Sequence, residues 1–307
     1  GRGLDLYPID VIAALLARVV RRPVKVEFDR VEEFIACPTR EPCTIRLRTA
    51  DPDHVLTGNP TGGSRTALGF GSVFLLASQE VVKKGLALAS EELEAAASDI
   101  EFADGKYRVK GTDRAVTITA LAKMHVGALN VDLRDQKVGA TYPNGCHVAE
   151  VEIEPETGDI EVVSYVAVDD AGNIINHQLV EGQMQGGITQ GAGHVLGEQV
   201  VYDAESGQLL TGSFMDYPMP RAVLVNNLRV LDYPVPTKTN PLGAKGVGEA
   251  GVTGSMPCIM NAVLDALREA GVSRFDMPAT PLRLWAAIRA ARDGRPRAFA
   301  VEDLPPA

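Results

Sequence analysis

Hydrophobic residues recur with a helical period in some parts of the chain and alternate with polar residues in others. Residues 9–20 and 71–97 carry apolar stripes of helical period, and residues 117–123 predict a short helix capped by its first residue. Residues 24–28 alternate as a strand, and a hairpin turn is expected at 103–106. The first half of the chain therefore mixes helices with short strands.

The second half predicts a longer antiparallel hairpin, followed by helices and a loop-rich segment. Residues 147–154 and 160–168 alternate on either side of a Glu-Thr-Gly turn. Beyond them we expect, in chain order, a glycine-dotted helix at 179–197, a hairpin at 198–211, an irregular segment at 234–254 and helices at 255–270 and 281–291. The predicted fold class is α+β, with mixed sheets and packed helices.

The composition is that of a globular protein without a nucleic-acid surface. Hydrophobic residues make up 45% of the chain and charged residues 23%. The formal net charge of −10 disfavours nucleic-acid binding, which needs clustered Lys and Arg. No apolar run reaches the ~20 residues of a bilayer span, and the opening residues lack a signal-peptide pattern. The expected location is therefore cytoplasmic.

Cysteines and histidines show no metal-binding spacing. The four cysteines are scattered without a C-x-x-C pair, and the five histidines lie far apart. An iron–sulfur cluster needs grouped thiolates, and a zinc hydrolase usually places two His one helical turn apart. We expect no metal ligand among the side chains of this chain.

The most informative segment is P-L-G-A-K-G-V-G-E-A-G at 241–251. Its small residues let the backbone approach a ligand closely. Glu249 is flanked there by glycine and apolar residues, so we expect its carboxylate to be poorly solvated and suited to act as a general base. Lys245 would weaken that effect if its amine lay beside the carboxylate. A solvated surface loop is the alternative interpretation.

Two other segments suggest ligand contacts. The segment G-Q-M-Q-G-G-I-T-Q-G at 182–191 contains Gln183, whose amide can both donate and accept hydrogen bonds, which suits the edge of a pterin or another amide-rich ligand. A glycine-rich contact between helices is its alternative interpretation. The segment T-G-G-S-R at 61–65 precedes a predicted helix, so its N–H groups, hydroxyls and Arg suit a phosphate group. A capped loop–helix junction is the alternative there.

Residues 246–251 also fit G-x-G-x-x-G, the dinucleotide-binding fingerprint. That motif must follow a strand and open a helix. Residues 237–242 contain Pro and Asn and do not predict a strand, so the match is weak. No lysine follows the glycines as in a phosphate-binding loop, and no G-x-S-x-G motif suggests a serine nucleophile.

In their order along the chain, these motifs resemble the cofactor-binding subunits of molybdenum hydroxylases, the group of xanthine dehydrogenase, aldehyde oxidoreductase and aerobic carbon monoxide dehydrogenase. The order is T-G-G-S-R, D-D-A-G-N-I-I-N (169–176), G-Q-M-Q-G-G-I-T-Q-G, D-Y-P-M-P (216–220), G-A-K-G-V-G-E-A-G and N-A-V-L-D-A (261–266). The opening block, G-L-D-L-Y-P-I-D-V-I-A-A-L-L-A-R, resembles the family too. The resemblance implies a fragment of the first molybdenum-cofactor-binding subdomain at 1–50 and the second, C-terminal one at 51–307.

The resemblance implies a role for each candidate residue. Glu249 would be the catalytic base. The cofactor would be a molybdenum–pterin compound, molybdopterin or its cytosine dinucleotide, and would be contacted by Thr61, Gly62, Gly63, Ser64, Arg65, Gln183 and Gly248. The pterin dithiolene, rather than a side chain, would hold the metal. The implied reaction is oxidative hydroxylation of an aldehyde, N-heterocycle or similar electron-poor carbon, with water as the oxygen source.

The resemblance also implies partners. The family's G-G-G-F-G and R-G-x-G segments are absent here, so we expect the remaining part of the molybdenum subunit on another polypeptide or segment. A heteromer with an iron–sulfur subunit and an FAD subunit is expected, with the clusters and FAD on those partners. Two alternatives stay open: a metal-free, non-catalytic homologue, and a nucleotide-dependent enzyme that uses the glycine-rich loops.

Overall fold

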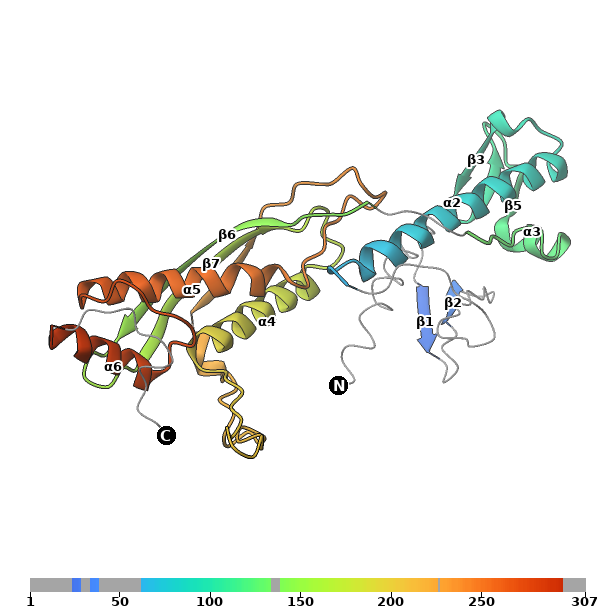
Figure 1. Ribbon diagram of the computed structural model, residues 1–307. Helices are drawn as coiled ribbons and strands as arrows, with labels where there is room; N and C mark the ends of the chain where they lie inside the picture. The colour runs from blue at the N-terminus through green and yellow to red at the C-terminus, as the bar shows by residue number, and fades with distance from the viewer. Residues whose placement is uncertain (1–23, 29–33, 39–61, 134–138, 226, 295–307) are drawn as a thin grey trace. The chain divides into compact units, whose positions relative to one another are not determined.

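The computed structural model describes the backbone of residues 24–28, 34–38, 62–133, 139–225 and 227–294, and the side chains from residue 62 onward. The chain divides into two compact units, residues 1–141 with 237–244 and residues 142–236 with 245–307 (Figure 1). The predicted helix at 9–20 and the predicted domain boundary at residues 50 and 51 lie outside the described residues. That boundary stays a prediction.

The first unit packs a long helix against a small sheet. Its elements are α2 (Thr66–Glu92), η1 (Ala97–Asp99), β3 (Ile100–Ala103), β4 (Lys106–Val109), β5 (Ala115–Thr117) and α3 (Ile118–Met124). The three strands form an antiparallel sheet in the order β3-β4-β5. β1 (Val24–Phe28) and β2 (Phe34–Pro38) form a separate antiparallel pair. The predicted strand at 24–28 and the turn at 103–106 are confirmed.

The core of the first unit centres on Tyr107, whose side chain is fully buried between the sheet and α2. The hydroxyl of Tyr107 donates a hydrogen bond to the Val82 carbonyl at 2.9 Å. Gly85 makes this packing possible, because a Cβ added there would lie 2.6 Å from Cζ of Tyr107. At the start of α3, the Thr117 side chain accepts a hydrogen bond from the Ala120 N–H, which confirms the predicted N-cap.

The second unit has helices lying over a three-stranded sheet (Figure 1). β6 (Asn144–Ile153) and β7 (Ile160–Asp170) are antiparallel, as predicted, and β8 (Leu228–Asp232) runs parallel to β7. The other elements are α4 (His177–Leu196), η2 (Ala222–Val225), α5 (Ala250–Glu269) and α6 (Pro281–Arg292). Buried residues of the sheet, α4, α5 and α6 share one hydrophobic core.

Three expectations about the elements need correction, and one strand was not predicted. The long helix spans Thr66–Glu92 rather than 71–97, because it begins directly after the glycine-rich loop and includes Gly69 and Gly71. The hairpin expected at 198–211 is reduced to a single bridge between Tyr202 and Leu209. The strand β8 was not predicted. The segment expected to be irregular to residue 254 becomes helical at Ala250, for a packing reason given below.

Candidate functional site

Glu249 occupies the N-cap position of α5 and is exposed in this chain. Its backbone has φ −115° and ψ −5°, and its side chain does not cap the helix. The loop before Glu249 is fixed by packing, because Ala244, Gly246 and Val247 are buried. The poor solvation that we expected for Glu249 is therefore not provided by the neighbours that the structure describes. Any water exclusion has to come from a group that covers it.

Lys245 is engaged with Asp170, at the end of β7, through a buried ion pair. The Asp170 carboxylate also accepts hydrogen bonds from the N–H groups of Gly172 and Val235, both at 2.8 Å. Burial acts to raise the pKa of Asp170, but the hydrogen bonds from Lys245, Val235 and Gly172 and the Lys245 charge outweigh it, so this pKa lies below its ordinary range. The Lys245 charge is thus directed to Asp170.

Glycines bring α4 and α5 into direct backbone contact. A Cβ added at Gly251 would lie 2.6 Å from the Met184 carbonyl oxygen, and one added at Gly187 would lie 2.9 Å from the Val252 nitrogen. One turn further on, a Cβ at Gly191 would lie 3.1 Å from Cβ of Ser255. These glycines serve the helix–helix contact that was one of the two interpretations of the motif. They also explain why α5 begins before residue 255.

Other residues of the same motif face away from that contact. Gln183, Gly186 and Gln190 follow the i, i+3, i+7 spacing of one helix face. Gly182 and Gly186 are exposed, with no atom within 4 Å of a Cβ added at either position. Gln183 directly precedes Met184, which contacts Gly251, so the structure brings Gln183 to the end of the helix pair where Gly248 and Glu249 lie. The motif therefore serves both packing and an open surface.

The T-G-G-S-R segment lies in the first unit and leads directly into α2. Thr61 lies outside the described residues. Gly63 and Ser64 have positive φ values of 60° and 55°, and Arg65 is the N-cap residue of α2. Both Gly62 and Gly63 are exposed, with no atom within 4 Å of an added Cβ. The loop thus has the bare backbone at a helix start that we expected, and its ligand stays a prediction.

Sequence analysis missed a buried hydrogen-bonded group centred on His147 of β6. His147 Nε2 lies 3.0 Å from Asp169 and Nδ1 lies 2.7 Å from the Tyr165 hydroxyl. The His147 and Asp169 side chains are 5% and 8% exposed. Burial raises the pKa of Tyr165, which keeps its hydroxyl protonated as a donor. The alternation of the two strands placed His147 and Tyr165 on predicted strands, with Asp169 directly after the second one, but the register between the strands could not be read from the sequence.

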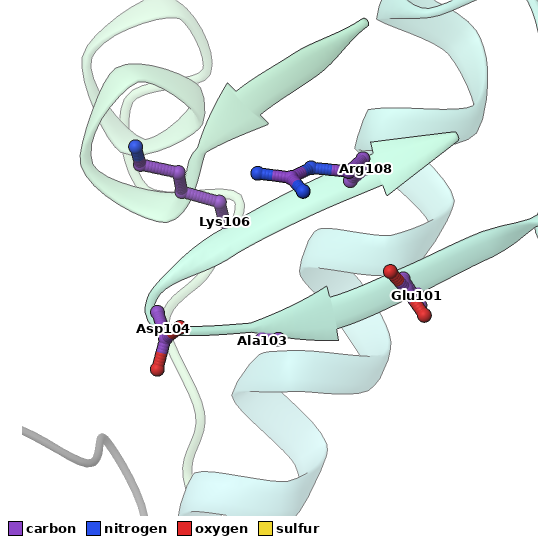
Figure 2. A pocket seen from close by; sticks show the side chains of 5 residues that line it. All are labelled: Glu101, Ala103, Asp104, Lys106 and Arg108. Carbon is purple, nitrogen blue, oxygen red and sulfur yellow. The ribbon is translucent and has the colours of Figure 1, made fainter. Parts of the chain in front are cut away.

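A shallow hollow on the first unit contains none of the predicted site residues. Figure 2 shows its lining, with side chains from both strands and the turn of the β3–β4 hairpin: Glu101, Ala103, Asp104, Lys106 and Arg108. All five are exposed and alternate with Phe102 and Tyr107, which pack toward α2. The hollow is a solvated sheet face of mixed charge. Across the described residues, no three His, Cys, Asp or Glu side chains are grouped as a metal site would require.

Comparison with known proteins identifies the family. Residues 37–225 match the family described as "molybdopterin cofactor-binding domain", which is more than half of the chain. The chain therefore belongs to this family, as the motif order predicted. Among its relatives, the carbon monoxide dehydrogenase large chain of Hydrogenophaga pseudoflava is 32% identical over 255 residues, which cover 80% of this chain and 32% of the relative. The nicotine 6-hydroxylase large subunit of Paenarthrobacter nicotinovorans is 33% identical over 248 residues, covering 77% and 30%.

Solved structures of related enzymes also resemble this chain. Reconstituted CO dehydrogenase from Oligotropha carboxidovorans has a TM-score of 0.69 at 30% identity, covering 79% of this chain and 31% of that one. Quinoline 2-oxidoreductase from Pseudomonas putida 86 has a TM-score of 0.62 at 34% identity, covering 75% and 30%. The predicted α+β class is confirmed. The chain spans about a third of the length of these relatives.

Proposed function

We propose that this chain is part of the catalytic, molybdopterin-binding subunit of a molybdenum hydroxylase. One observation carries the proposal: in a chain of this family, an exposed carboxylate, Glu249, begins α5, whose first turn packs against α4 next to Gln183. The second unit thereby brings together an acceptor for protons and a surface suited to a flat ligand.

The residues present fit a molybdenum–pterin cofactor. The bare backbone at Gly182 and Gly186 leaves room for a ring system, and the Gln183 amide can both donate to and accept from its polar edge. In the first unit, Gly62, Gly63 and Arg65 are exposed, and their loop offers N–H groups and an Arg to a phosphate. We propose that both loops contact the cofactor, in its molybdopterin or cytosine dinucleotide form, with Thr61 and Gly248 as further contacts.

The chemistry follows a division of labour between cofactor and protein. When bound, the molybdenum–pterin group supplies oxygen transfer and accepts two electrons from the substrate. Glu249 would accept a proton at its carboxylate as water-derived oxygen is added to the substrate carbon. The Lys245 ammonium group, four residues earlier, is held by Asp170 in an ion pair. A cofactor lying over Glu249 would also exclude water from the exposed carboxylate.

The substrate class is proposed from chemistry and from the relatives. Hydroxylation with water as the oxygen source suits an aldehyde, an N-heterocycle or a similar electron-poor carbon. The names of two relatives, nicotine 6-hydroxylase and quinoline 2-oxidoreductase, refer to N-heterocycles. We favour that class for this chain.

Partners are part of the proposal, because the chain spans about a third of its relatives' length. The described segment between α4 and β8 exposes many large hydrophobic side chains, among them Phe214 and Met215 at 86% and 93%. We propose that the remaining part of a molybdenum subunit covers such surface, and that iron–sulfur and FAD subunits complete a cytoplasmic complex. None of the described helices combines the length and apolar character needed to cross a bilayer.

The test is a cofactor measurement on the chain purified with its co-expressed partner subunits. We expect about one molybdenum and one pterin per chain, and loss of both in a Gly186→Trp variant that fills the open face of α4. Wild-type protein without molybdenum would instead support a metal-free homologue. Binding of a nicotinamide dinucleotide in place of pterin would support the nucleotide-dependent alternative.

A further inference from the structure

We propose that Asp169 and Asp170, the last two residues of β7, are positioning residues that fix Glu249 from both sides along the chain. Each carboxylate binds a different residue, and we call these two contacts the anchors of Glu249. Asp170 holds Lys245, four residues before Glu249, and Asp169 holds His147, which packs against Gly254, five residues after it. The inference rests on the proposed role of Glu249 as base.

The anchor before Glu249 has side-chain and backbone parts. Lys245 donates its ammonium to Asp170, and its N–H donates to the Ala171 carbonyl at 2.8 Å. Both side chains of the pair are about nine-tenths buried, at 11% and 9% exposure. Two backbone N–H groups, from Gly172 and Val235, hold the other oxygen of the Asp170 carboxylate. A buried carboxylate with this many donors has a defined orientation, so the loop cannot shift without breaking charged hydrogen bonds.

The anchor after Glu249 works through close packing. A carboxylate only accepts hydrogen bonds, so His147 Nε2–H donates to Asp169 and, in the neutral ring, Nδ1 accepts from Tyr165. These two bonds fix the plane of the ring. A Cβ added at Gly254 would lie 2.6 Å from His147 Nδ1, so α5 rests directly on the oriented imidazole. Any side chain at 254 would push the helix away from the ring.

Together the two anchors connect one strand end to both flanks of the exposed Glu249. Glu249 is exposed, and the two anchored flanks restrict where its backbone can lie. General base catalysis depends on that position, since proton transfer requires heavy atoms within hydrogen-bond reach. This gives Asp169 and Asp170 a functional role without contact with substrate.

The test is hydrogen–deuterium exchange on the full chain, read at the amides of residues 243–253. Asp170→Asn and Lys245→Met should speed exchange there by on the order of 10-fold or more, and Asp169→Asn should do so from residue 250 onward. Lys245→Arg should restore most of the protection. The control is Arg292→Met, which breaks an exposed ion pair with Glu156 in the same unit and should leave 243–253 unchanged.

The outcomes separate positioning from general stability. Faster exchange confined to 243–253 supports the proposal, whereas unchanged exchange there, or an equal increase throughout the second unit, overturns it. In the complex loaded with cofactor, Asp170→Asn should lower kcat at least ~10-fold while KM stays within about two-fold and molybdenum content is kept. Because the exchange measurement needs no cofactor, it can succeed even if the proposed function fails.

Discussion

Gly251 of α5 lies on the backbone of α4 so closely that a Cβ on it would be 2.6 Å from the Met184 carbonyl oxygen. A side chain at 251 has no space, and the nearest atoms belong to backbone that cannot rotate away. Gly251→Ala should therefore destabilise the second unit by about 1–3 kcal/mol, as overpacking does. The measurement is the free energy of unfolding in urea.

Gly186 provides the matched control for that substitution. It lies on α4, one residue before Gly187, but its added Cβ would meet no atom within 4 Å. Gly186→Ala should be neutral or stabilise by up to about 1 kcal/mol, because alanine favours the helix. Equal effects of the two substitutions would contradict the assigned helix–helix contact.

The two glycines show what the sequence could and could not predict. Helical period and glycine content predicted α4 within two residues, and alternation predicted the β6–β7 hairpin. The role of each glycine depends on which face meets α5, and that is set by a contact between segments about sixty residues apart. For the same reason α5 was predicted to begin at residue 255, since Gly251 and Gly254 suggest a loop until His147 and α4 are seen packed against them.

The candidate site, too, could be predicted only in part from the sequence. A glycine-rich loop carrying Glu249 was predicted from local composition, although its last two residues, Ala250 and Gly251, belong to α5. The ion pair between Lys245 and Asp170 joins residues 75 positions apart, so the sequence left the direction of the lysine open. Poor solvation of Glu249 was favoured over the alternative of a solvated loop, but apolar neighbours in sequence can point into the core, as Val247 does at 7% exposure.

Because the Tyr107 hydroxyl is buried, we expect the first unit to lose stability at alkaline pH. Burial raises the pKa of its hydroxyl in the folded chain, while the unfolded value is about 10. Above pH ~10 the unfolded chain loses this proton and the folded chain keeps it, so stability is full below that pH and falls as pH rises further. The free energy of unfolding, measured between pH 8 and 11, should decline more steeply in wild type than in Tyr107→Phe.

At neutral pH the same substitution should cost about 0.5–1.5 kcal/mol, the usual value of one buried hydrogen bond, here the bond to the Val82 carbonyl. Parallel pH curves for the two proteins would show that Tyr107 ionises as readily in the folded chain as in the unfolded one.

Asp170 predicts the opposite dependence in acid. Burial raises its pKa, but hydrogen bonds from Lys245, Val235 and Gly172 more than compensate, and its folded pKa lies below the ordinary range. It therefore contributes stability above the unfolded pKa of about 3.9, and this is lost as pH falls through the lower, folded value. The free energy of unfolding of the second unit, measured from pH 6 down to pH 2.5, should fall more steeply in wild type than in Asp170→Asn.

The exposed apolar segment predicts self-association of the isolated chain. Among the residues between 200 and 235 whose side chains the structure describes, twelve large hydrophobic ones are exposed, and surfaces of this kind usually contact a partner. Replacing Phe214 and Met215 by Ser should reduce concentration-dependent light scattering and binding of a hydrophobic dye. Val126→Ser removes a side chain that is equally exposed, at 89%, in the first unit and should change scattering less. A wild-type chain that stays monomeric at high concentration would contradict this prediction.

Glu249→Gln is the substitution that should most damage turnover of the assembled enzyme. Gln keeps the shape and hydrogen-bonding capacity of Glu but cannot accept the proton, and positioned proton transfer is typically worth ~10²–10⁴ in rate. We therefore expect kcat to fall at least ~10²-fold with molybdenum content unchanged. Glu269, exposed at the other end of the same helix, is the matched control, and Glu269→Gln should leave kcat within about two-fold. Near wild-type turnover in Glu249→Gln with full metal content would exclude a role as base. Loss of molybdenum would assign Glu249 to holding the cofactor, because removing one negative charge at an exposed N-cap should leave the helix itself intact.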